Sequence, residues 1–143
     1  MKLLTGLLLT FLVAATVSSV NSKTLMIGNS GEPATLDPHK YNLRLEETLL
    51  NDLFLGLTTF NANGEIVAGA AESWETTTDG LTWRFFLRED LKWSDGKNLT
   101  AEDFVYSFRR LLNPQTAASL SYFLYMIKNA EQVNNAQKAV SSL

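Results

Sequence analysis

The pattern of apolar and polar positions divides the chain into an apolar start, one helix, a β-rich middle and a helical end. Residues 24–28 form a short apolar run that predicts a strand, and residues 29–38 are punctuated by Gly and Pro as a loop is. Leucines then recur every fourth position, which predicts an amphipathic helix over residues 43–55 with Gly56 as its C′ residue. These leucines are Leu45, Leu49, Leu53 and Leu57.

Two hairpins are predicted in the middle of the chain. Strands at residues 58–60 and 65–67 flank Asn61-Ala62-Asn63-Gly64, a hairpin turn signal. Strands at residues 73–77 and 81–88 flank a second turn at Asp79-Gly80. The last of these strands has the clearest period of two, with Leu81, Trp83, Phe85 and Leu87 on one face.

The last third of the chain reads as helical. A turn at Asp95-Gly96 precedes Thr100-Ala101-Glu102-Asp103, which resembles a capping box with Thr100 as N-cap. An apolar stripe follows, and Asn113-Pro114 ends the helix. A second apolar helix is predicted over residues 120–127, whereas residues 129–143 are polar and show no strong stripe.

The first 22 residues have the order of a secretory signal peptide. Met1-Lys2 is a short positive start, residues 3–17 are mostly apolar, and residues 18–22 are small and polar. We predict cleavage before Lys23; cleavage after Ser18 or Ser19 is the alternative position. The other interpretation, an uncleaved membrane anchor, is disfavoured because the apolar run is shorter than the ~20 residues that a membrane span needs. Residues 23–143 would then be a periplasmic product that does not insert into the membrane.

Composition removes several classes of function. The formal charge is −3, which argues against a nucleic-acid surface. The chain has no cysteine, so disulfides, thiolate metal sites and a lipid-modified N-terminal cysteine are excluded. It has one histidine, His39, too few for a histidine-rich metal cluster. An exported protein without cysteine suits the bacterial periplasm.

No sequence pattern supports catalysis. His39 is the only histidine for a triad, and no Gly-x-Ser-x-Gly elbow is present. Acidic pairs such as Glu46-Glu47 are adjacent on a helix and point in different directions. We therefore predict that the protein is not an enzyme and interpret His39 as a surface or turn residue. A small secreted hydrolase is the weakest hypothesis.

Two ligand motifs also fail. If Gly64 were position six of a calcium loop, position twelve would be Ala70, where a Glu is needed. Gly96-Lys97 is followed by Asn98 instead of the Ser or Thr of a phosphate loop. We predict neither a metal nor a cofactor. The aromatic residues of the middle segment favour a sheet core over a ligand-stacking surface. They are Trp74, Trp83, Phe85 and Trp93.

Several short segments between residues 24 and 130 together resemble one known family. They include Glu32-Pro33-Ala34-Thr35-Leu36-Asp37-Pro38, Leu53-Phe54-Leu55-Gly56-Leu57, Ala71-Glu72-Ser73-Trp74, Asp79-Gly80-Leu81-Thr82-Trp83-Arg84-Phe85, Lys92-Trp93-Ser94-Asp95-Gly96, Leu99-Thr100-Ala101-Glu102-Asp103-Phe104-Val105-Tyr106-Ser107-Phe108, Arg110-Leu111-Leu112-Asn113-Pro114-Gln115-Thr116 and Lys128-Asn129-Ala130. The set resembles the N-terminal signature of the extracellular solute-binding proteins of family 5, the periplasmic peptide-binding subunits of ABC importers. Family members are several times longer than this chain.

The resemblance implies an α/β class: an incomplete periplasmic binding protein-like II fold, with a small, largely antiparallel sheet and flanking helices. Residues 23–143 would be the N-terminal part of the family domain. The resemblance also implies that two lobes close over an oligopeptide or dipeptide, which is then delivered to membrane permease subunits. A murein peptide or a nickel chelate is an equally open substrate. No cofactor and no nucleic acid are implied.

The resemblance also points to three ligand-binding candidates, Glu46, Tyr122 and Phe123. The alternatives for these residues are a solvated helix acid and two core aromatics. The rival to peptide binding is a truncated, non-binding fragment or a stand-alone structural module.

This rival interpretation makes structural predictions for the chain. The 24–28 strand should lack partners, and the 43–55 helix should show part of its leucine stripe to water. The hairpins and the helix after Thr100 should be well packed, while residues 24–43 should be loosely attached.

Overall fold

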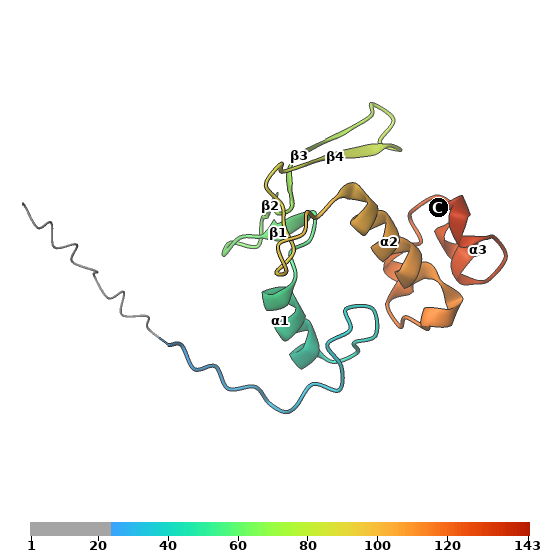
Figure 1. Ribbon diagram of the computed structural model, residues 1–143. Coiled ribbons are helices and arrows are strands. Elements are labelled where there is room, and N and C mark those ends of the chain that lie inside the picture. The colour runs from blue at the N-terminus through green and yellow to red at the C-terminus, as the bar shows by residue number, and fades with distance from the viewer. Residues whose placement is uncertain (1–23) are drawn as a thin grey trace, which may run out of the picture.

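One helix, two consecutive hairpins and then a series of short helices follow one another in the computed structural model, which describes residues 24–143 (Figure 1). The elements are α1 (Arg44–Leu53), β1 (Thr58–Phe60), β2 (Ile66–Ala68), β3 (Ala71–Thr76), β4 (Trp83–Leu87), α2 (Ala101–Leu112), η1 (Pro114–Thr116), η2 (Ser121–Leu124), α3 (Ala130–Asn134) and η3 (Val140–Ser142), where η denotes a 3₁₀ helix. The mixed α and β class agrees with the sequence prediction. The predicted signal peptide, residues 1–22, lies outside the described residues.

The strands form two separate antiparallel pairs rather than one sheet. β1 pairs with β2, and β3 pairs with β4, with a register shift between Ala71 and Ser73. Both predicted turns are confirmed: Gly64 and Gly80 adopt φ of +78° and +71°, a conformation that glycine reaches without a steric penalty.

The two hairpins are joined by a close backbone crossing at Gly69. The N–H groups of Gly69 and Ala71 both donate to the carbonyl of Leu57, at 3.2 and 2.9 Å. A Cβ atom on Gly69 would stand 2.5 Å from the carbonyl oxygen of Gly56, so only glycine fits here. Gly56 itself is not the C′ residue that the leucine pattern predicted, because α1 ends at Leu53 with Phe54 in an extended C-cap conformation.

The boundaries of α2 follow the sequence prediction closely. The backbone N–H of Thr100 donates to Oδ2 of Asp103 at 2.8 Å, which is the returning half of a capping box. The Thr100 hydroxyl donates to the same oxygen at 3.2 Å, whereas we expected it to accept a first-turn N–H. Asn113 then takes an extended conformation before Pro114 and ends the helix.

A small core closes at the C-terminal end of α2. Leu112, Ala130 and Val133 are fully buried, and Leu124, Tyr125, Val140 and Leu143 pack around them. The side chain of Asn134 organises the polar edge of this core, because it donates to the carbonyl of Leu112 and accepts from Ser121 and Tyr125.

Residues 129–143, whose sequence shows no strong stripe, still supply two of the three fully buried residues of this core, Ala130 and Val133. Both lie on the short helix α3. One prediction for this region is wrong. The helix predicted over residues 120–127 is only the 3₁₀ turn η2.

The β3–β4 hairpin extends away from the helices, as Figure 1 shows, and its aromatic side chains are open to water. Trp83 is 56% exposed, and Trp74 and Phe85 are each 36% exposed. The prediction that the hairpins are well packed is therefore wrong for this chain, as is the sheet-core interpretation of the tryptophans. A two-stranded sheet has two faces, and neither face of β3–β4 is covered by a helix.

The N-terminal part of the described chain leaves apolar side chains exposed in two places, residues 24–28 and the end of α1. Residues 24–28 form no strand, and their apolar side chains are almost fully exposed. Part of the leucine stripe of α1 is exposed too, as predicted, at Leu53, which is 61% exposed. Phe54 and Leu55, just after the helix, are also open to water. Among the described residues, no helix combines the length and the hydropathy needed to cross a membrane.

Candidate functional site

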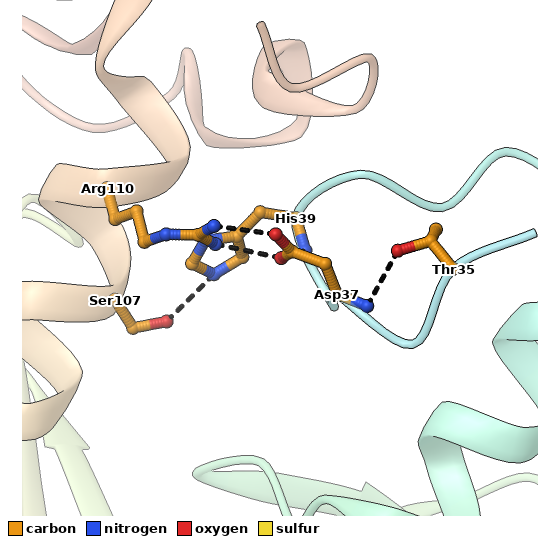
Figure 2. A network of polar contacts seen from close by, with 5 residues as sticks. All are labelled: Thr35, Asp37, His39, Ser107 and Arg110. Atoms are coloured by element: carbon orange, nitrogen blue, oxygen red, sulfur yellow. Dashed lines mark hydrogen bonds and ion pairs between the residues drawn. The ribbon is translucent and has the colours of Figure 1, made fainter. Parts of the chain in front are cut away.

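A polar cluster attaches the loop before α1 to the middle of α2 (Figure 2). Arg110 donates from Nη1 to Oδ1 of Asp37 at 2.8 Å and from Nη2 to Oδ2 at 2.6 Å. The same Nη1 lies 2.7 Å from Nδ1 of His39, and Nε2 of His39 lies 3.2 Å from Oγ of Ser107. We call Asp37, His39, Ser107 and Arg110 the clasp.

Local turn chemistry prepares the loop side of the clasp. The Thr35 hydroxyl accepts the N–H of Asp37 at 3.0 Å, and Oδ1 of Asp37 accepts the N–H of His39 at 3.0 Å. These side-chain to backbone bonds close two short turns around Pro38. On the other side, Ser107 and Arg110 are three positions apart on α2 and so lie on one face.

The electrostatics of the clasp favour one protonation state for each group. The bidentate bond to Arg110 holds the pKa of Asp37 far below its usual range, and Asp37 raises the pKa of Arg110. Burial lowers the pKa of His39, the positive charge of Arg110 lowers it further, and Asp37 opposes both effects. At neutral pH the clasp is therefore an ion pair beside a neutral imidazole.

The clasp brings a serine, a histidine and an aspartate together, but the geometry is unlike that of a hydrolytic triad. Arg110 can only donate, so Nδ1 of His39 accepts and the ring proton sits on Nε2. That proton points at Ser107, so His39 donates to the hydroxyl and cannot remove its proton. In a triad, Nδ1 would instead carry the proton and donate a hydrogen bond to the carboxylate. The arrangement is suited to fastening two segments.

Glu46, the first predicted ligand residue, lies buried at the start of α1 with 2% of its surface exposed. Oε1 accepts the N–H groups of Ala34 and Thr35, and Oε2 accepts those of Asn42 and Leu43, at 2.9–3.3 Å. These backbone bonds, led by that from Asn42, lower the pKa of Glu46. The carboxylate thereby ties both ends of the loop that carries Asp37 and His39.

Tyr122 and Phe123, the other predicted ligand residues, lie together on η2 and face solvent. They are 54% and 59% exposed, and their ring centroids are 4.5 Å apart with planes tilted by 32°. Because neither ring is buried, the core-aromatic alternative does not hold for this chain. The two rings form an open aromatic surface on η2.

Sequence reasoning missed the clasp. It interpreted His39 as a surface or turn residue and expected residues 24–43 to be loosely attached, and that expectation is wrong for residues 34–43. One signal was available: Asp37 and Arg110 stood in two of the segments that carry the resemblance. Within residues 24–143, no group of three or more His, Cys, Asp or Glu side chains is placed to hold a metal.

Comparison with known proteins identifies the chain at family level. Residues 65–140, more than half of the chain, match the model of the bacterial extracellular solute-binding proteins, family 5. This chain belongs to that family. The periplasmic oligopeptide-binding protein OppA of Haemophilus influenzae is 43% identical over 121 residues, which are 83% of this chain and 22% of the relative.

Solved structures show the same relationship. The Escherichia coli murein tripeptide binding protein MppA superposes with a TM-score of 0.76 at 39% identity, over 82% of this chain and 23% of its own. Haemophilus influenzae OppA in complex with the peptide RPPGFSPFR superposes with a TM-score of 0.75 at 44% identity, over 78% of this chain and 22% of its own. The family and the periplasmic binding protein-like fold are as predicted. The chain spans about a fifth of the length of these relatives.

Proposed function

We propose that this chain is the N-terminal part of the substrate-binding subunit of a peptide ABC importer. In this role it contributes to capturing peptides in the periplasm and presenting them to a membrane permease. The observation that carries the proposal is the superposition on a peptide-bound OppA over 78% of the chain, at 44% identity. The signal-peptide pattern of residues 1–22 supports the periplasmic location.

Tyr122 and Phe123 are our candidates for direct peptide contact. Their paired, exposed rings offer an apolar surface that stacks on varied side chains without requiring one particular partner. Glu46 contributes by a different route, because both of its oxygens are already occupied by backbone N–H groups. We propose that Glu46 affects binding through the position of residues 34–43.

Deletion of the gene that encodes this chain tests the proposed function. In a strain that needs an amino acid, the deletion should abolish growth when that amino acid is supplied only within peptides, and free amino acid should restore growth. Unchanged growth on peptides in the deletion strain would contradict the importer role.

The contact residues are tested in the periplasmic product of the same gene. Tyr122→Ala and Phe123→Ala should each weaken the binding of a tri- to pentapeptide mixture by about tenfold in calorimetry, as the loss of a central aromatic contact does. Tyr106→Ala is the matched control, because Tyr106 is a 68% exposed aromatic on α2 outside the proposed surface. Equal losses in all three variants would argue against a specific site at η2.

A second candidate is a structural fragment that does not bind peptide. The exposed aromatic face of β3–β4 favours this candidate, because such a face needs a covering surface before it becomes part of a cleft wall. Residues 23–143 alone should then show no micromolar peptide binding, since a closed cleft needs two walls. Micromolar binding by this segment alone would mean that it holds a complete site.

A further inference from the structure

We propose that the clasp is an acid-sensitive latch, in which protonation of His39 weakens the attachment of residues 35–39 to α2. The proposal is independent of peptide binding. It rests on the arrangement of three groups: the guanidinium of Arg110, the ring of His39 and the hydroxyl of Ser107.

The first step is the hydrogen-bond inventory of the ring. Nδ1 of His39 lies 2.7 Å from Nη1 of Arg110, and an arginine nitrogen has protons but no free lone pair. This contact therefore exists only while Nδ1 is unprotonated. A second ring proton would place two donors and two positive charges against each other at hydrogen-bond distance.

The second step is the set of charges around the ring. Arg110 faces the His39 ring from α2, and Asp37 faces it from the loop. Tyr106, one turn before Arg110 on α2, raises the pKa of Arg110. Asp37 already uses both oxygens on Arg110, and its Oδ1 also accepts the N–H of His39. Neither oxygen of Asp37 is therefore left free to compensate a new positive charge at Nδ1.

The third step is the direction of the pH effect. The pKa of His39 is lowered from 6.5 in the closed clasp, whereas a released histidine titrates near its ordinary value. The open state therefore binds the proton more tightly, and opening becomes easier as pH falls below 6.5. Asp37 stays ionised throughout this range, because its own pKa is held far lower. The remaining ion pair limits the change to a loosening.

The fourth step concerns the loop of residues 34–43, which the clasp attaches to α2. The N–H groups of Asp37 and His39 are bonded within this loop, and Glu46 on α1 fixes its two ends. Loosening at His39 thus exposes the centre of the loop while its ends stay fixed. The affected amides are those of residues 37 and 39.

NMR on the purified full chain tests the latch, and the single histidine makes its ring signal unambiguous. At about pH 7.5 the ring nitrogen shifts should show the Nε2–H tautomer, and the titration midpoint should lie below 6.5. Hydrogen exchange, corrected for the intrinsic rate, should then show less protection of the amides of residues 37 and 39 at low pH. Protection should fall about tenfold for each pH unit by which the midpoint is lowered.

Two comparisons complete the test. In His39→Gln the amide oxygen accepts from Arg110 and the amide nitrogen donates to Ser107 without titrating, so the pH dependence at residue 37 should disappear. The amide of Ala70, bonded to Gly56 at 2.9 Å far from the clasp, serves as the internal control. An Nδ1–H tautomer at pH 7.5, or a pH dependence that persists in His39→Gln, would overturn the proposal. The tautomer of the wild-type chain can overturn the proposal even if the variant does not fold.

Discussion

Arg110 holds Asp37 by both carboxylate oxygens, at 2.8 and 2.6 Å, across 73 positions of sequence. This is the longest-range ion pair among the described residues, and it is only partly open to solvent, with 31% of the arginine and 24% of the aspartate side chain exposed. The other ion pairs within residues 24–143 join near neighbours or lie on the surface. The pair therefore links the loop before α1 directly to α2.

The bidentate geometry predicts that Arg110→Lys lowers the free energy of unfolding by about 1–3 kcal/mol, because the compact ammonium of lysine lacks the planar fork that bonds both carboxylate oxygens in parallel. Arg84→Lys is the control, since the Arg84–Glu75 pair is 69% and 55% exposed and should change stability by less than about 0.5 kcal/mol. Urea unfolding measures the free energy of unfolding of both variants. Equal effects in the two variants would show that the clasp adds nothing to an ordinary surface pair.

The four backbone N–H groups that donate to Glu46 predict a loss of stability in Glu46→Gln. The amide offers one acceptor oxygen, and its NH₂ group would face two of the four backbone N–H donors. The urea midpoint should fall, and the amides of Ala34 and Thr35 or of Asn42 and Leu43 should lose exchange protection. Glu47→Gln, at the neighbouring exposed position, should leave both measurements unchanged.

Acid should destabilise the chain through its bonded carboxylates. The pKa values of Asp37 and Glu46 are lowered from 3.8 and 4.5, so their stabilising contribution is present above these values and is lost as pH falls below them. The urea midpoint should therefore drop between about pH 5 and pH 2.5. Asp37→Asn should flatten this drop, whereas Asp52→Asn, at an exposed position of α1, should not.

The core predicts a large cost for Leu112→Ala. Leu112 is fully buried against Ala130 and Val133, so truncation leaves a cavity and should cost about 2–4 kcal/mol. Leu53→Ala removes the same atoms from a side chain that is 61% exposed and should cost about 1 kcal/mol or less. Similar costs at both positions would mean that the C-terminal core does not hold α2 and α3 together.

Much of the fold was predictable because local rules act over a few residues. The turns at Gly64 and Gly80, the pairing partners of both hairpins and the start and end of α2 follow from turn residues, alternation and capping. The exposure of Leu53 on α1 was also foreseen, since a stripe without a covering surface stays open. Membership of the solute-binding family was visible in the same local segments.

The candidate functional residues were less predictable from the sequence than the fold. Tyr122 and Phe123 were named from a resemblance, and the structure places them side by side without testing their role. Glu46 was named as a ligand-binding candidate by the same resemblance. Its oxygens accept hydrogen bonds from backbone N–H groups, which no periodicity of the helix reveals. His39 was interpreted as a surface or turn residue, and it does lie in a turn. Its partners were not foreseen, because one histidine in a loop carries no pattern that indicates them.

The sequence by itself determined α1, α2, both hairpins with their turns and the family, because each depends on residues that are neighbours along the chain. Only the tertiary structure decided that Asp37 and His39 meet Arg110, that Asn134 closes the core at Leu112, and that the tryptophans of β3–β4 stay exposed. These outcomes depend on which distant surfaces approach one another. The contact between distant segments sets which side chains form hydrogen bonds and which are buried. Composition and hydrophobic periodicity do not specify that contact.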